Sequence, residues 1–282
     1  MFSIFEQTSS KCSKFITNAY STSFSLGIKT LSKKFHDPIC GIYAFVRYAD
    51  EIVDTFHGFD KKTLLERFKK DTYVAIDEKI SLNPVLYSFQ KVVNDYKIPN
   101  DLIEAFFRSM EMDLYKNAYG QDGYEEYIYG SAEVVGLMCL KVFAEGDEKL
   151  YEELKHTARA LGAAFQKVNF LRDMKSDFDE RGRVYFPGID FENFKEAAKK
   201  QIEDEIAADF ALAKEGIDRL PLSARGGVEL AYLYYLKLFA KIKAQPASKI
   251  KEARIRVPDY QKLGILAWST IQNRFNYKLL TT

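Results

Sequence analysis

Apolar side chains recur every three or four residues through most of this chain, and that period predicts helices rather than strands. We find no convincing run of alternating apolar and polar residues between hairpin turns. Turn residues such as Gly58 and Gly146 separate the periodic segments. The predicted helices span residues 4–19, 23–31, 36–56, 61–79, 83–96, 100–117, 122–145, 147–177, 191–215, 222–243 and 259–276. Because no flexible linker or internal repeat divides them, we expect one all-α domain over residues 1–282.

Residues 166–187 form a polar stretch. The stretch continues a predicted helix whose preceding residues are small and apolar, so an apolar sequence would be expected there. Its sequence is QKVNFLRDMKSDFDERGRVYFP. Its acids and amides are Gln166, Asn169, Asp173 and Asp177, which are three, four and four residues apart and share one face of a helix. Two explanations stay open for this stretch alone. One is a bound divalent cation, and the other is a solvated helix end whose acids pair with Lys167, Lys175 and Arg172.

A second acidic stretch, IYAFVRYADEIVDTF, covers residues 42–56. Tyr43, Arg47, Asp50 and Asp54 share one helical face, and apolar residues cover most of the remaining circumference. A helix of this kind is buried, and carboxylates on it are costly unless they are paired or bind a metal ion. A buried ion-pair network built on Arg47 therefore explains this stretch alone as well as a metal site does.

The two stretches together favour the metal site, because four carboxylates converge if the two helices face each other. Oxygen ligands at that density suit Mg²⁺, which keeps several waters and is completed by substrate phosphates. An arginine beside each acidic pair, Arg47 and Arg172, suits a diphosphate. Metal and arginines together stabilise a diphosphate leaving group, and the 22 Phe and 18 Tyr suggest an apolar interior or cavity. The residues thus indicate ionisation of a lipophilic diphosphate within a helical cavity.

Amino-acid composition indicates the class of protein, its partners and its location. The chain is 47% hydrophobic and 29% charged, which is typical of a soluble globular protein, and its net charge of +1 argues against a nucleic-acid partner. Three scattered cysteines predict core thiols in a reducing compartment rather than disulfides or a zinc site. No window approaches 18 consecutive apolar residues, and the N-terminus lacks a signal-peptide pattern. We therefore expect a cytoplasmic protein, whose basic run KIKAQPASKIKEARIR is either a solvated connection or a peripheral contact with an anionic membrane.

The chain resembles the squalene/phytoene synthase family, the head-to-head prenyl synthases. The matching stretches are STSFSLGIKTL, IYAFVRYADEIVD, SMEMDL, YIYGSAEVVGLMCLKVF and LGAAFQKVNFLRDMKSDFDERGRVYFP. The last is highly specific, because N-x-L-R-D-x-x-x-D followed by R-G-R-V-Y-x-P is hard to obtain by chance. Glu51 stands where many members have Asp, but the outer acids Asp50 and Asp54 remain.

The resemblance implies the all-α isoprenoid synthase bundle, a single domain with a central apolar cavity. It implies Mg²⁺ ligands, with Mn²⁺ as an alternative cation, at Asp50, Asp54, Asp173 and Asp177, which join Tyr185 as the expected catalytic residues. The substrate-binding residues it implies are Ser21, Phe24, Tyr43, Arg47, Tyr129, Gln166, Asn169, Arg172 and Arg183. Arg183 and Tyr185 would belong to a flap over the cavity, and Tyr235 and Arg256 are further candidates. Asp113 is expected either to support the metal site or to pair with a lysine.

Members of this family condense two identical allylic diphosphates through a cyclopropylcarbinyl diphosphate. The sequences of the matching stretches are most similar to those of bacterial phytoene synthases. This implies that the substrate is two geranylgeranyl diphosphates, that the product is phytoene and that NADPH is not used. Squalene or dehydrosqualene synthesis from farnesyl diphosphate is the alternative. A non-catalytic, lipid-binding relative would have lost the metal aspartates, and a head-to-tail chain elongator would need D-D-x-x-D pairs, which neither stretch has. The sequence makes no prediction of oligomeric state.

Overall fold

The computed structural model describes residues 2–115, 119–189, 191, 194–252, 254–256 and 258. Within these ranges the chain is helical, and apart from an isolated bridge residue at Val184 it contains no strand, which confirms the all-α prediction. The elements are α1 (Phe2–Tyr20), α2 (Thr22–Thr30), the 3-10 turn η1 (Lys33–Phe35), α3 (His36–Asp54), α4 (Lys61–Glu78), α5 (Pro84–Tyr96), α6 (Asn100–Tyr115), α7 (Gln121–Ile128), the π-helical turn η2 (Tyr129–Glu133), α8 (Val134–Ala144), α9 (Glu148–Arg181), α10 (Glu196–Arg219), α11 (Leu222–Lys243) and α12 (Ala247–Ile250).

Most helix boundaries lie within a few residues of the predicted ones, and the exceptions have local causes. The predicted helix 147–177 continues to Arg181, because the chain leaves the helix only at Gly182, whose φ of 62° favours glycine. The predicted helix 191–215 begins five residues later, at Glu196. The predicted helix 259–276 lies outside the described residues.

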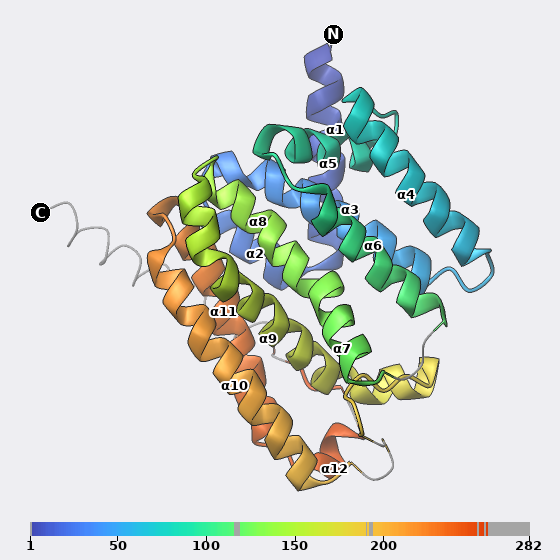
Figure 1. Cartoon of the computed structure of the whole chain (residues 1–282), viewed down its shortest axis with the longest axis vertical. Coiled ribbons are helices and arrows are strands. Elements are labelled where there is room, and N and C mark those ends of the chain that lie inside the picture. Colours follow the sequence, from blue (N-terminus) through green and yellow to red (C-terminus); the bar gives the residue numbers. More distant parts are fainter. Residues whose placement is uncertain are drawn as a thin grey trace, which may run out of the picture.

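Helix α9 occupies the middle of the C-terminal half of the molecule. It packs against α8 on one side and α10 on the other, and Figure 1 shows these three helices running alongside one another. Two glycines allow α9 to approach α8 and η2 closely. A Cβ on Gly136 would lie 3.1 Å from the carbonyl oxygen of Ala158, and one on Gly162 would lie 2.8 Å from that of Ala132. These glycines therefore serve helix packing.

Buried apolar residues form two clusters: the first contains α3 and the N-terminal turns of α9, and the second contains the part of α9 from Ala163 onward. The first cluster includes residues of α3, such as Ile42, Phe45 and Ile52, packed with α5 and α6. The second includes Val168 and Phe170 of α9, packed with residues of α10 and α11. The acidic faces of α3 and α9 are therefore carried by separate parts of the hydrophobic core.

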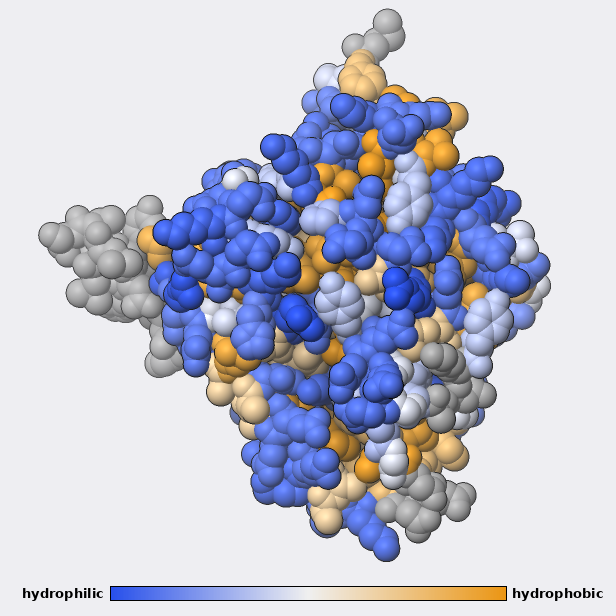
Figure 2. Space-filling model, viewed as in Figure 1, coloured by the Kyte–Doolittle hydropathy of each residue, from blue (hydrophilic) through white to orange (hydrophobic). Residues whose placement is uncertain are grey.

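One helical stretch among the described residues, Gln121–Ala144, is long and apolar enough to cross a membrane by length and composition. Within the fold, 61% of its most apolar window is buried, as in an ordinary core helix. On the face drawn in Figure 2, hydrophilic residues cover most of the surface and hydrophobic ones show in patches among them. Packing inside the fold therefore explains why residues 121–144 are apolar.

Candidate active site

Helix α3 carries the first acidic pair on its half-buried side. Burial of Ile42, Phe45 and other apolar residues orients the helix, which leaves Arg47 and Asp50 partly exposed. The Arg47 guanidinium pairs with Asp50 and with Glu51 and lies over the ring of Tyr20, 4.6 Å from its centroid. Arg47 therefore forms ion pairs on α3, as the alternative explanation of this stretch expected. The same contacts place its guanidinium beside the carboxylates of Asp50 and Glu51.

Three predicted substrate-binding residues meet beside this end of α3. Ser21 caps α2, because its Oγ accepts a hydrogen bond from the Phe24 amide at 3.2 Å. The Phe24 ring stacks on Tyr43, with 4.7 Å between centroids and 24° between planes. Burial raises the pKa of Tyr43, while Arg47 opposes that shift. The fold thus brings Ser21, Phe24, Tyr43 and Arg47 together.

Helix α9 carries the second acidic pair near its C-terminal end. Arg172 donates through Nε to Oδ1 of Asp173 at 2.9 Å, and Asp173 is only 17% exposed. Asp177, one turn further on, is buried. The two lysines proposed as partners for these acids pair elsewhere: Lys167 with Asp209 at 2.8 Å and Lys175 with Asp179 at 2.6 Å. The proposed pairing with the two lysines is therefore wrong, whereas the proposed contact of Arg172 with Asp173 is present.

Arg254, in the segment after α12, is a site residue that no sequence pattern indicated. Its Nε lies 2.7 Å from Oδ1 of Asp173, 81 residues away along the chain. Arg256 was the expected candidate in this segment, and its backbone carbonyl accepts a hydrogen bond from Lys241. Both arginines belong to the run ARIR and are only two residues apart. Only the fold reveals which of them faces α9.

Gln166 and Asn169 lie along the same face of α9 and contact neighbouring elements. Gln166 donates to the Ser131 hydroxyl at 3.3 Å, and Asn169 accepts a hydrogen bond from the Tyr235 hydroxyl at 3.2 Å. Tyr235 also stacks on Phe165, with 3.9 Å between centroids. Tyr235, expected as a further candidate for the site, thus contacts Asn169 of α9.

Tyr129 has different surroundings from the other predicted residues. It lies in the π-helical turn η2, with the Arg159 guanidinium 5.2 Å from its ring centroid. Burial raises its pKa, and its charged neighbours are Asp101, Arg159 and Glu133. None of these belongs to either acidic pair, so the structure gives Tyr129 no direct link to them.

Arg183 and Tyr185 lie just after α9 and form a buried group with Asp113 of α6. Arg183 places Nη1 2.7 Å from Oδ1 of Asp113 and donates through Nη2 to the backbone carbonyl of Asp113 at 2.8 Å. Tyr127 donates to Oδ2 of Asp113 at 2.9 Å. Burial raises the pKa of Asp113 to about 7, Arg183 opposes this shift, and Asp54 adds to it. The partner of Asp113 is thus an arginine, where a lysine was one of the expectations.

The acidic residues do not form a ready-made metal cluster. In the part of the chain that the structure describes, no group of three or more His, Cys, Asp or Glu side chains is close enough to hold a metal ion. Each helix instead offers carboxylates next to an arginine. This arrangement fits Mg²⁺, which takes one or two protein carboxylates and completes its shell with waters and substrate phosphates.

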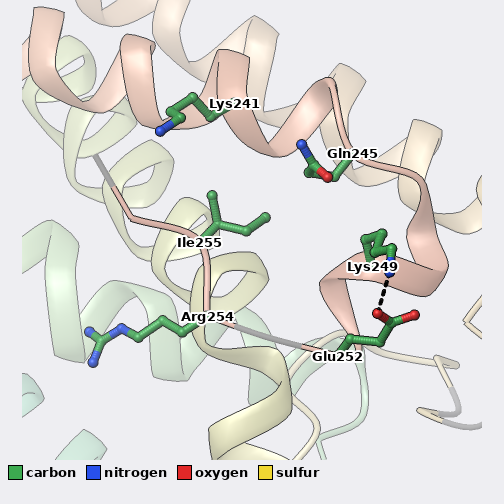
Figure 3. Close-up of a pocket in the computed structure, with 6 residues that line it drawn as sticks. All are labelled: Lys241, Gln245, Lys249, Glu252, Arg254 and Ile255. Atoms are coloured by element: carbon green, nitrogen blue, oxygen red, sulfur yellow. Dashed lines mark hydrogen bonds and ion pairs between the residues drawn. The ribbon is translucent and has the colours of Figure 1, made fainter. Parts of the chain in front are cut away.

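A hollow of about 380 Å³ lies at the C-terminal segment, and one of its lining residues, Arg254, contacts Asp173 of α9. It is lined by Lys241, Gln245, Lys249, Glu252, Arg254 and Ile255. Figure 3 shows the Arg254 guanidinium pointing away from the Lys249–Glu252 pair. Lys249 and Glu252 lie 2.6 Å apart, and Lys241 donates to the Arg256 carbonyl. Arg254 is therefore the residue that links this hollow to Asp173.

Comparison with known proteins assigns this arrangement to a family. The profile described as squalene/phytoene synthase matches residues 17–261. The chain belongs to the squalene/phytoene synthase family. This membership covers both acidic helices and the segment that carries Arg254.

Individual relatives in the family are distant. A phytoene synthase from Arthrospira platensis is 26% identical over 288 residues, which cover 92% of this chain and 91% of that protein. A bifunctional lycopene cyclase/phytoene synthase from Gibberella fujikuroi is 24% identical, and the match covers 89% of this chain but only 50% of that protein. The chain thus spans about half the length of that bifunctional relative. A solved dehydrosqualene synthase with a bound ligand matches with a TM-score of 0.80 and 21% identity, covering 95% of this chain and 98% of the other. That likeness shows the shared fold.

Proposed function

We propose that this protein is a prenyltransferase that condenses two molecules of geranylgeranyl diphosphate head to head, giving phytoene in carotenoid biosynthesis. The observation that carries the proposal is the pairing of aspartate with arginine on both α3 and α9, as Arg47 with Asp50 and Arg172 with Asp173. Each pair combines carboxylates for a divalent cation with a guanidinium for a diphosphate. Two such pairs match a reaction that uses two diphosphates.

In this proposal, the residues that hold Mg²⁺ are Asp50, Asp54, Asp173 and Asp177, and Mn²⁺ is an alternative cation. When bound, the metal neutralises negative charge that develops on the departing diphosphate. The guanidiniums of Arg47, Arg172 and Arg254 exchange their present carboxylate partners for diphosphate oxygens, which they bind bidentately. Gln166 and Asn169 orient the diphosphates from the same face of α9.

The aromatic residues around the acids provide a suitable environment for the prenyl cation. Stacked pairs such as Phe24–Tyr43 and Phe165–Tyr235 present ring faces, which attract cations. The reaction needs a dry site, because water would capture the cation as an alcohol. With water excluded, the first condensation releases one diphosphate and one proton and forms a cyclopropylcarbinyl diphosphate. Its ionisation releases the second, and loss of a proton gives phytoene without NADPH.

A second candidate is squalene or dehydrosqualene synthesis from farnesyl diphosphate. The likeness in fold to a dehydrosqualene synthase favours it, whereas the phytoene synthase relative favours the longer substrate. The two candidates share the same diphosphate chemistry and differ in the length of the prenyl tail. A cytoplasmic location, peripheral contact with a membrane and the lack of a nucleic-acid partner stay predictions from composition.

The test is product analysis with purified protein and Mg²⁺. Geranylgeranyl and farnesyl diphosphate are supplied separately, each with and without NADPH, and the hydrocarbon and released diphosphate are quantified. We expect phytoene from geranylgeranyl diphosphate, two diphosphates released per phytoene, no effect of NADPH and loss of activity with EDTA. Selective turnover of farnesyl diphosphate would refute the phytoene assignment, and no diphosphate release from either substrate would refute the reaction class.

A further inference from the structure

Asp113 is a buried carboxylate that the proposed chemistry does not use. Its side chain is 3% exposed, and that of its partner Arg183 is 6% exposed. Arg183 contacts both the carboxylate and the backbone carbonyl of Asp113, and Tyr127 donates to the other carboxylate oxygen. Because these groups occupy its oxygens, Asp113 is arranged to hold Arg183 rather than a cation.

The path of the chain after α9 explains how Arg183 reaches this position. Gly182 adopts a left-handed conformation, and its amide donates to the Phe178 carbonyl at 2.8 Å. The next amide, that of Arg183, donates to the Asp177 carbonyl at 3.1 Å. The segment that follows therefore starts from the helical turn that carries Asp177, and any displacement of Arg183 acts on that turn.

Arg183 in turn positions Tyr185. Its Nη1 donates to the Tyr185 hydroxyl at 3.1 Å. The Tyr185 ring lies flat on Phe170 of α9, with 4.0 Å between centroids and 7° between planes, and stacks at 5.8 Å on Tyr119. Residues 182–187 are thus tied to α9 by aromatic stacking and to α6 by the ion pair with Asp113.

Asp113 also lies within electrostatic reach of the acids on α3. After burial and Arg183, Asp54 is the next cause of its pKa shift, and Asp50 acts in the same direction. Tyr185 is similarly influenced by Asp113 and Asp177. Through Arg183, whose amide donates to the Asp177 carbonyl, Asp113 is connected to the turn of α9 that carries Asp177.

We propose that Asp113 is a positioning residue: through its ion pair with Arg183 it holds residues 182–187 beside Asp177 and thereby keeps water from the prenyl cation. This inference rests on the proposed function. The ion pair links α6 to the segment after α9, and the Arg183 amide joins that segment to the turn that carries Asp177.

The first readout is the fate of the prenyl cation. If water enters, it adds to the cation and loses a proton, which gives the prenyl alcohol in place of the hydrocarbon. We expect Asp113→Asn and Arg183→Gln each to raise the ratio of prenyl alcohol to hydrocarbon by about tenfold or more. The double variant should be no worse than either single variant, because the two residues act as one pair.

The second readout does not depend on turnover. Hydrogen exchange of amides 182–189 is measured with Mg²⁺ and inorganic diphosphate, and without them. In the wild-type protein, the two ligands together should slow exchange in this segment. In Asp113→Asn, exchange should be about tenfold faster and should respond little to the ligands.

The control is Glu203→Gln on α10. Glu203 and Lys199 form an ion pair as buried as Asp113 and Arg183, with side chains 6% and 4% exposed. Removing one partner of such a pair destabilises the fold, so both carboxylate variants should lower the melting temperature by a similar amount, on the order of 10 °C. Glu203→Gln should leave the alcohol ratio and the exchange of residues 182–189 unchanged.

Two results would overturn the inference: wild-type exchange and alcohol ratio in Asp113→Asn, or equal changes in Glu203→Gln. If the wild-type protein releases no diphosphate from either prenyl substrate, the proposed function fails. The exchange measurement with inorganic diphosphate still decides the positioning role in that case.

Discussion

Helices α3 and α9 each carry two aspartates four residues apart with an arginine beside them, but they hold these groups in different ways. On α3, Arg47 comes from the same helix as its partners Asp50 and Glu51. On α9, Asp173 meets Arg172 from its own helix and Arg254 from the segment after α12. The pairing of Arg47 with Asp50 on α3 therefore follows from helical periodicity, whereas the contact of Arg254 with Asp173 depends on tertiary structure.

The largest expected effect comes from removing one carboxylate from either helix. Asp50→Asn and Asp173→Asn should each lower the rate of diphosphate release more than about 100-fold, since loss of an outer-shell partner alone costs about 10- to 100-fold. Steady-state release from geranylgeranyl diphosphate measures this. If only one variant loses activity, the two helices do not act together.

A matched control for these variants is Asp179→Asn on α9. Asp179 is half exposed and pairs with Lys175 at 2.6 Å. Its substitution removes a surface ion pair, which contributes little to stability. Activity should stay within about twofold of the wild-type value, which separates a specific loss at Asp173 from a general effect of removing charge from the helix.

A smaller effect is expected for the contact that distinguishes α9 from α3. Arg254→Gln removes the second guanidinium at Asp173, and we expect the apparent affinity for Mg²⁺ and substrate to fall roughly 10- to 100-fold. Titration of activity against Mg²⁺ measures this change. Arg256→Gln, two residues further on, should have no such effect, and equal behaviour of the two variants would remove Arg254 from the site.

The smallest effect concerns the hydrogen bond between Tyr235 and Asn169. Tyr235→Phe keeps the stacking on Phe165 and removes one hydrogen bond, which is worth about 0.5–1.5 kcal/mol. A two- to tenfold fall in kcat/KM is therefore expected. Tyr232→Phe, in the same helix but packed against Phe210, serves as the control, and an equal fall there would show that Tyr235 acts only through packing.

The helices and the two acidic faces could be predicted from the sequence because both follow from local periodicity. The run IYAFVRYADEIVD has one polar side whatever its neighbours are, and Arg47 lies within reach of Asp50 on the same helix. The contacts of Arg254 and Asp113 could not be predicted in the same way. They join residues 81 and 70 positions apart, and only the packing of α6, α9 and the C-terminal segment brings them together.

Binding of Mn²⁺ in the presence of inorganic diphosphate tests the central claim most directly, because it needs no turnover. The free Mn²⁺ signal in electron paramagnetic resonance is titrated with wild-type protein, Asp50→Asn, Asp173→Asn and the double variant. The proposed site predicts that diphosphate tightens Mn²⁺ binding to the wild-type protein and that each single substitution weakens it at least about tenfold. Undiminished binding in the double variant would contradict a site formed by α3 and α9.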